Sequence, residues 1–298
     1  MKKPVFDELT EPNLEMRIGA LYALERVAKD SEMDRAQIFE IFSAYVSNNF
    51  DAPETFSHPA LKRFGPDEQE PGINRRFWKE SISSDTDQHE LSIYMLSVGA
   101  PGGLGREWVK KLKRPRPDTR AAVSVIVRNV DRFGTDRNGG GAPALAFTGA
   151  NLQRADFRGA NLAGATFEAC QLDGALFDRS DLSDAKFFAC SLIGASFYGA
   201  KLSGARFARS RLECVNAGNI VSMSGCAFWH CDCSGSVFDT ADLSNSSFRH
   251  VTARKAYFHA KEMNDTLFSR CDIRDGGLSA HSMRGLGIHE TWVPETGV

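Results

Sequence analysis

The sequence lacks any run of about 18 consecutive apolar residues, so no segment is long and apolar enough to span a bilayer. The N-terminus, MKKPVFDEL, has two lysines but no apolar stretch after them, and we therefore expect no secretory signal. Its seven cysteines are odd in number and thinly spread over 298 residues, which favours a reducing compartment over a disulfide framework. We expect a cytoplasmic protein with no membrane partner.

A strong net charge of either sign is also absent. The formal net charge of -2 by itself implies neither a nucleic-acid nor a membrane partner. The apolar fraction of 42% and the charged fraction of 25% are those of a soluble globular protein that can bury a sizeable core. The length suffices for one large domain or two ordinary ones.

A five-residue repeat dominates the C-terminal half. Large residues alternate strictly between Phe and Leu at 14 consecutive positions, and a small residue lies two positions before each: Phe147, Leu152, Phe157, Leu162, Phe167, Leu172, Phe177, Leu182, Phe187, Leu192, Phe197, Leu202, Phe207 and Leu212. Five residues turn about 500° on an α-helix, so these positions would form no stripe there. On a flat strand, an odd spacing would send them to alternate faces. We therefore predict a coil that turns a corner every five residues and directs each large residue inward.

The alternation also predicts the number of sides. Like residues stack on like only when the number of sides is even, and two sides enclose nothing, so we predict four sides and 20 residues per coil. The register breaks once, because one extra residue lies between Ala217 and Met223, where Gly218 and Asn219 tolerate a bulge. The spacing then continues to Ile288, which gives seven coils and a rod of about 34 Å.

These repeats resemble those of the pentapeptide-repeat family, whose pattern is A(D/N)LXX. The matching segments read GANLQ, GANLA, RSDLS and TADLS. The resemblance implies a right-handed quadrilateral β-helix over residues 145–288, but it does not fix a function, since the characterised members are binders of various partners. The predicted fold class is α+β multidomain, with an N-terminal helical domain followed by this β-helix.

The N-terminal half is predicted to be largely helical. Asn13 is the expected cap of a first helix, Ser31 with Asp34 forms a capping box for a second, and Pro117 with Asp118 opens a third. The apolar positions of the three helices are expected at Leu14, Ile18, Leu21, Tyr22 and Ala28, at Ile38, Ile41, Phe42, Tyr45 and Val46, and at Val123, Ile126, Val127 and Val130.

The expected domain organisation follows from these patterns. Residues 1–132 form a helical domain with an insert, 133–144 a glycine-rich linker, 145–288 the β-helix and 289–298 a C-terminal tail. The stretch RIGALYALERVAKDSEMDR resembles the helical segment that precedes the repeats in a bacterial subgroup of the family, and also a HEAT-like helix pair. In that subgroup transmembrane helices often stand upstream, and this sequence has none.

Residues 106–120 hold seven basic and two acidic residues. They could contact phosphates. We favour a solvated amphipathic helix that buries Trp108, Val109 and Leu112.

Cys226, His230, Cys231 and Cys233 have a spacing like that of a zinc site. The repeat register argues against one, because it points the three cysteines inward and His230 outward. The inward column that contains Cys231 also holds Cys170, Cys190 and Cys271. We predict that these cysteines are small apolar fillers and that the protein binds no metal.

Motifs for catalysis or cofactors are scarce. The segment 99–105, GAPGGLG, lacks the Lys-Ser/Thr of a P-loop and the spacing of a dinucleotide site. No Ser-His-Asp or paired-carboxylate arrangement is visible, and a β-helix packed with Phe and Leu leaves no interior cavity. We expect no cofactor and no enzyme; an enzyme would have to use the N-terminal half.

One side of the predicted coil, called the basic side below, carries Phe187, Phe207, Phe228, Phe248 and Phe268. Trp229 and Phe188 also point outward there, and Glu168 is its only acid. The partner-binding residues that we predict on this side are Lys186, Arg206, Arg209, Trp229, His230, Arg249, His250 and Arg270. A second side, the acidic side, exposes Asp181, Asp184, Asp242, Glu262 and Asp265 against Lys201 and Arg284. The alternative is surface charge that serves solubility alone.

The leading hypothesis is a non-catalytic interaction scaffold that binds a protein partner of unknown identity through the outer faces of the β-helix. The family resemblance implies an alternative, since some members mimic duplex DNA and occupy the DNA gate of gyrase, a type II topoisomerase. Those members are strongly acidic, whereas residues 146–288 hold 15 basic and 14 acidic residues. Direct nucleic-acid binding through the basic side is a third hypothesis, which we do not favour. An outward Trp229 would also be accounted for if the N-terminal domain folded back over it, or if a second copy covered it in a homodimer.

Overall fold

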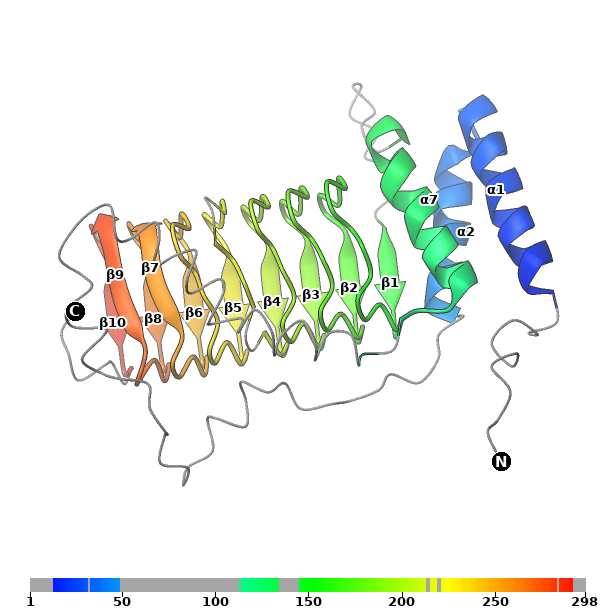
Figure 1. Cartoon of the computed structure of the whole chain (residues 1–298). Helices are drawn as coiled ribbons and strands as arrows, with labels where there is room; N and C mark the ends of the chain where they lie inside the picture. Colours follow the sequence, from blue (N-terminus) through cyan, green and yellow to red (C-terminus); the bar gives the residue numbers. More distant parts are fainter. Residues whose placement is uncertain are drawn as a thin grey trace, which may run out of the picture.

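Three helices precede a parallel β-solenoid of about seven turns (Figure 1). The computed structural model describes residues 13–31, 33–48, 112, 114–133, 145–212, 215–218, 221–282 and 284–291. The helices are α1 (Leu14–Asp30), α2 (Arg35–Asn48) and α7 (Pro117–Phe133). None of the helices in this part of the chain combines the length and the apolar character that a membrane crossing requires.

The strands form two parallel sheets. The larger has eight strands in the order β1-β2-β3-β4-β5-β6-β8-β10, and β7 pairs with β9 in the smaller. The bounds are β1 Ala146–Thr148, β2 Thr166–Glu168, β3 Lys186–Phe188, β4 Arg206–Ala208, β5 Ala227–Trp229, β6 Ser247–Arg249, β7 Tyr257–Glu262, β8 Leu267–Ser269, β9 Gly277–Ser282 and β10 Gly287–His289. The larger sheet is the basic side of the sequence prediction.

The strand register confirms the predicted coil. Phe147 pairs with Phe167, and Phe167 with Phe187, a spacing of 20 residues. The spacing becomes 21 between Phe207 and Phe228. The extra residue lies between 216 and 222, because Asn216 still pairs with Ser196 at 20 whereas Ser222 pairs with Lys201 at 21. Gly218 is buried in this interval, and Asn219 lies outside the described residues.

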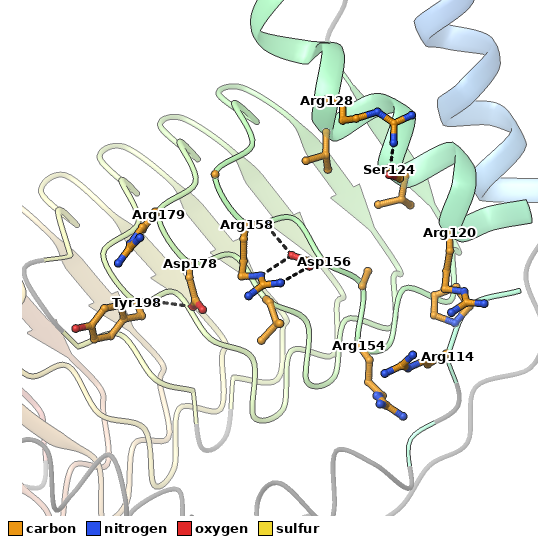
Figure 2. Close-up of a pocket in the computed structure, with 16 residues that line it drawn as sticks. Arg114, Arg120, Ser124, Arg128, Arg154, Asp156, Arg158, Asp178, Arg179 and Tyr198 are labelled. Atoms are coloured by element: carbon orange, nitrogen blue, oxygen red, sulfur yellow. Dashed lines mark hydrogen bonds and ion pairs between the residues drawn. The ribbon is translucent and has the colours of Figure 1, made fainter. Parts of the chain in front are cut away.

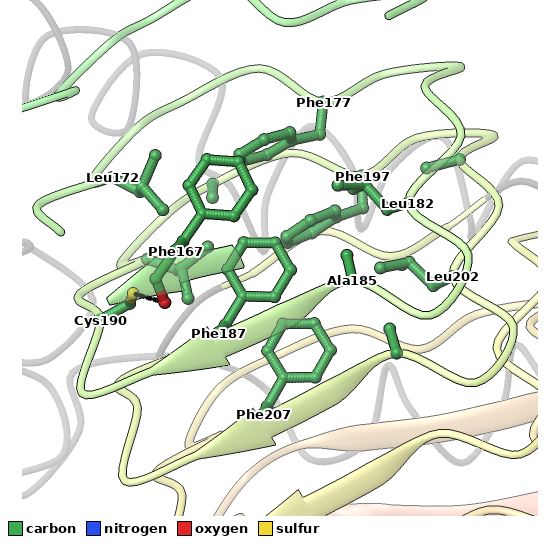
Figure 3. Close-up of a cluster of buried hydrophobic side chains, with 14 of the residues drawn as sticks. Phe167, Leu172, Phe177, Leu182, Ala185, Phe187, Cys190, Phe197, Leu202 and Phe207 are labelled. Atoms are coloured by element: carbon green, nitrogen blue, oxygen red, sulfur yellow. Dashed lines mark hydrogen bonds between the residues drawn. The ribbon is translucent and has the colours of Figure 1, made fainter. Parts of the chain in front are cut away.

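The interior is filled by stacked columns of large side chains. All 14 predicted Phe and Leu positions from 147 to 212 are at most 2% exposed. Phe167 stacks on Phe187 with ring centroids 4.9 Å apart, while Phe177 on the facing side meets Phe187 edge-on at 6.1 Å (Figure 3). Stacking along a column and edge contacts between columns are the favoured geometries of aromatic pairs, so the alternating repeat is well suited to this core.

The helices form where they were predicted, with corrections at their starts. Asn13 precedes α1 but has a left-handed backbone and makes no side-chain capping hydrogen bond. Ser31 ends α1, and its hydroxyl donates to the carboxylate of Asp34 at 2.7 Å, so α2 begins only at Arg35. The capping-box prediction at Ser31 was therefore wrong, because Ser31 already belongs to the C-terminal cap of the preceding helix.

Two predicted apolar-face positions also differ. Tyr22 and Ile41 are 46% and 43% exposed, whereas Glu25 is buried. Glu25 is stabilised there because its carboxylate accepts a hydrogen bond from Asn129 Nδ2 at 2.7 Å and pairs with Arg128 at 3.1 Å, which ties α1 to α7. A charged side chain becomes compatible with burial only through partners that lie far away in the sequence.

A second buried carboxylate joins all three helices. Asp118 is inaccessible to solvent and accepts a hydrogen bond from Tyr45 of α2 at 2.8 Å. It also pairs with Arg17 of α1 and with Arg116, each at 2.9 Å. Burial raises the pKa of this carboxyl, but the hydrogen bonds from Tyr45 and Arg116 outweigh that effect and the pKa is lowered overall.

The helices cap the first coil. α2 contacts β1, and the backbone N–H of Thr148 donates to Ser47 Oγ at 2.9 Å. Buried side chains of the helices and of the coils form one continuous hydrophobic core. An uncovered first strand would expose unpaired backbone groups and apolar side chains, so this packing gives the solenoid a closed N-terminal end.

The segment between the helices is described only in part. Leu112 is buried as expected, but Trp108, Val109 and most of the predicted linker lie outside the described residues. The amphipathic helix expected over 106–120 was wrong for 114–116, which are not helical. Proline at 115 and 117 explains this, because proline disfavours helical backbone in the residue before it and suits the first position of a helix.

Candidate macromolecular interface

The predicted partner-binding residues stand in three outward columns of the larger sheet. Each strand turns its middle Phe inward, so the residues on either side of it face outward. Lys186 and Arg206 are register partners before the Phe column, and Trp229 and Arg249 are register partners after it. Side chains that sequence spacing places 20 or 21 residues apart are therefore neighbours on the surface.

The third column lies at the corner that follows each strand. Arg209, His230, His250 and Arg270 have φ of 52°, 52°, 53° and 55°, so this corner has a left-handed backbone. The rings of His230 and His250 stack with centroids 4.7 Å apart, and Trp229 lies 5.0 Å from His230. The repeated corner geometry thus lines up side chains from successive coils.

Two large apolar side chains are exposed on this side. Trp229 is 47% exposed and Phe188 is 39% exposed, and Ala208 separates them in their column. The guanidinium of Arg209 lies over the ring of Phe188 at 5.8 Å from its centroid, a cation–π arrangement. The described helices do not cover Trp229, because they pack at the β1 end of the rod (Figure 1).

The structure brings five of the eight predicted residues into one group, which we call the Trp229 patch together with Phe188: Arg209, Trp229, His230, Arg249 and His250. Lys186 and Arg206 lie across the Phe column from it. Arg270 is partly neutralised, because its Nε is 2.6 Å from a carboxylate oxygen of Glu290, a partner that the sequence analysis did not consider.

The acidic side is less uniform than its composition indicates. Lys201 stands between Asp181 and Ser222 in the same column, with its ammonium 3.6 Å from the Asp181 carboxylate. Asp242 and Glu262 follow further along the same column. The negative charge is therefore interrupted near the middle of the rod.

The cysteines take the inward positions predicted for them. Cys226, Cys231 and Cys233 are at most 3% exposed, while His230 is exposed. The thiol of Cys231 donates to the carbonyl oxygen of Phe207 at 3.3 Å, and burial raises its pKa to about 11. No group of His, Cys, Asp or Glu within the described ranges has the geometry to hold a metal ion.

One feature was missed by the sequence analysis. A groove of about 980 Å³ separates α7 from the first coils on the side opposite the larger sheet, and six arginines line it (Figure 2). Repeat arithmetic could have placed Arg154, Arg158 and Arg179 on one side. It could not have placed α7 beside them, because that contact depends on how the helices pack.

The comparisons with known proteins agree with the repeat analysis. Residues 144–216 match the family described as "Pentapeptide repeat region", and residues 222–259 match "Pentapeptide repeats (8 copies)". Comparison with curated proteins gave no match.

Three solved structures illustrate the similarity. QnrB1, described as a plasmid-mediated fluoroquinolone resistance protein, is 19% identical over 48% of this chain and 84% of its own, with a TM-score of 0.28. A pentapeptide repeat protein from the Arabidopsis thaliana thylakoid lumen is 25% identical over 38% of this chain and 61% of its own, with a TM-score of 0.17. Rfr23 from the cyanobacterium Cyanothece 51142 is 15% identical over 50% of this chain and 64% of its own, with a TM-score of 0.18. From the family matches and the four-sided coil, the repeat region of this chain belongs to the pentapeptide-repeat family.

Proposed function

We propose that this protein is a non-catalytic scaffold that binds a protein partner through the Trp229 patch. The observation that carries the proposal is the 47% exposure of Trp229 beside Arg249 on the next coil. Trp and Arg are the residues that most often dominate binding energy at protein interfaces. A tryptophan in an outward position contributes nothing to the packed interior, which the Phe columns already fill.

The patch also indicates the chemistry of the partner. Trp229 offers a flat apolar surface, and Arg209 and Arg249 on the neighbouring coils present guanidinium groups around it. Guanidinium groups bind carboxylates in paired hydrogen bonds. The complementary surface is therefore an apolar pocket with acidic residues at its rim.

Binding to a type II topoisomerase is the second candidate. It rests on the family resemblance, and the charge pattern speaks against DNA mimicry here. A duplex presents continuous negative charge, whereas Lys201 interrupts the acidic side and the basic side is positive. A supercoiling assay with gyrase and increasing amounts of the full chain would separate this candidate from the scaffold.

Site-specific photocrosslinking in cells of the source organism tests the proposal. A photoreactive residue at Ala208 lies inside the patch between Phe188 and Trp229, and one at Ser222 on the acidic side is the matched control. We expect a discrete protein adduct from position 208 that disappears when Arg249→Ala is added, and none from 222. Equal adducts at both positions, none at 208, or a nucleic-acid adduct at 208 would refute the protein-binding scaffold.

A further inference from the structure

The arginine groove has two walls from distant parts of the chain. α7 supplies Arg120, Val123, Ser124, Val127 and Arg128, and the first coils supply the residues facing them, with Arg114 and Pro115 at one end (Figure 2). Tyr198, Asp178 and Arg179 lie at the opposite end of the view from Arg114 and Arg154. The groove is separate from the Trp229 patch, because the coil side that lines it is opposite the larger sheet.

The groove is strongly positive. Its lining includes six arginines and two aspartates, and both aspartates already have partners. Asp156 is bound by both guanidinium nitrogens of Arg158, at 2.8 and 2.6 Å. Asp178 accepts hydrogen bonds from Ser196 Oγ at 2.5 Å and from the backbone N–H of Tyr198 at 3.2 Å. Neither carboxylate is directed at the arginines of the other end.

At that end two like charges are held together. Arg154 Nη1 donates to the carbonyl oxygen of Leu112 at 3.2 Å, which fixes its half-buried side chain beside Arg114. Burial and the charge of Arg114 both lower the pKa of Arg154. Such a juxtaposition is unfavourable unless an anion is shared between the guanidinium groups. Arg120, on the adjacent wall, points toward the same end of the groove (Figure 2).

The remaining wall is suited to an uncharged group. Leu176, Val123 and Val127 are apolar, and Tyr198 supplies an aromatic ring at the far end. A volume of about 980 Å³ lies at the upper end of the range of small-molecule pockets, roughly 300–1,000 Å³. Asp156 and Asp178 break the positive charge along the coils, so a long polyanion would meet repulsion as it left the arginine end.

We propose that this groove binds a phosphate-bearing small molecule of nucleotide size, with its phosphates between Arg114, Arg120 and Arg154 and its uncharged part toward Leu176 and Tyr198. Three guanidinium groups at one end fit a multivalent phosphate better than a single carboxylate, which one arginine satisfies. The site goes beyond the scaffold function and is independent of the patch.

Titration calorimetry on the full chain tests the site, with ATP and inorganic pyrophosphate as probes. We expect ATP to bind, pyrophosphate to compete with it, and Arg114→Gln or Arg120→Gln to weaken ATP binding at least tenfold. Arg206→Gln on the basic side is the matched control and should leave the affinity within twofold. Arg120→Gln is the safer variant for folding, because Arg120 is an exposed residue of α7, and thermal melts verify each variant.

Several results would overturn the proposal. One is the absence of ATP and pyrophosphate binding at millimolar concentration. Another is binding that Arg114→Gln and Arg120→Gln leave unchanged in folded protein. A third is displacement of ATP by a glutamate-rich peptide or a single-stranded oligonucleotide that binds more tightly, which would assign the groove to a polymer instead.

Discussion

Phe187 and Phe188 are adjacent in the chain and lie on opposite faces of the same strand, with 1% and 39% of their surface exposed. Phe187 stacks between Phe167 and Phe207, at 4.9 and 4.8 Å. Phe188 instead faces solvent under the guanidinium of Arg209. The same residue type therefore serves the core at one position and the candidate interface at the next.

This pair gives a matched test of the core. We expect Phe187→Ala to reduce the free energy of unfolding by about 3–5 kcal/mol, because the stacked column leaves a cavity that cannot collapse. Phe188→Ala should cost less than about 1 kcal/mol, since it removes an exposed ring. Denaturant unfolding followed by circular dichroism measures both values. Similar losses for the two variants would contradict the assignment of faces.

The Trp229 patch predicts a separation of binding from stability. Trp229→Ala combined with Arg249→Ala should leave the thermal midpoint nearly unchanged, because both side chains are exposed. It should weaken binding to the partner captured from position 208 by about 2 kcal/mol or more, roughly thirtyfold. Charge reversal of Asp242 and Asp265 on the acidic side is the control and should do much less. Unchanged affinity in the double variant would leave the patch without a function.

Asp118 predicts how the helical cap responds to acid. Its pKa is lowered in the folded chain, so its contribution to stability is present above the ordinary value near 4 and is lost as pH falls through the folded value. Asp118→Asn should destabilise the cap by about 3 kcal/mol at pH 7, because Arg17 and Arg116 lose their shared buried partner. The variant should also show a flatter pH dependence between pH 7 and 3.

Asp156→Asn is the control for this effect. The pKa of Asp156 is also lowered, first by its hydrogen bonds with Arg158, but its side chain is 53% exposed. Solvent screening limits such a pair to about 1 kcal/mol or less. Helical circular dichroism during thermal unfolding at several pH values measures both variants. A steeper acid dependence in Asp118→Asn than in the wild type would reverse the proposed sign.

The buried thiols predict slow chemistry. With a pKa near 11, Cys231 is almost entirely protonated at pH 8, and the thiolate is the reactive form. We expect Cys226, Cys231 and Cys233 to react with iodoacetamide at the rate of unfolding, and quickly in denaturant. Residue-resolved mass spectrometry measures the labelling, and elemental analysis should find no zinc. Rapid native labelling of Cys231, or stoichiometric zinc, would overturn the filler interpretation.

The repeat half shows how far a sequence can determine a fold. Each coil buries the same positions, so Phe167 predicts Phe187, and the pattern reveals the coil length and the interval that holds the extra residue. The predicted neighbours Trp229 and Arg249 follow from the same arithmetic, since parallel strands one coil apart must pair. Local periodicity suffices here because each coil contacts little beyond the coils on either side of it.

The helical half depended on contacts that no local pattern encodes. Glu25 is buried because Asn129, 104 residues away, donates to it, and Asp118 is buried because Arg17 and Tyr45 reach it from two other helices. The arginine groove is of the same kind, since Arg154 meets Arg120 only after α7 has packed beside the first coils. Periodicity in the chain was enough to determine the coil and its outward columns. Tertiary packing was needed to determine where charges are buried and where a hollow remains, because both depend on the fit between segments far apart in the chain.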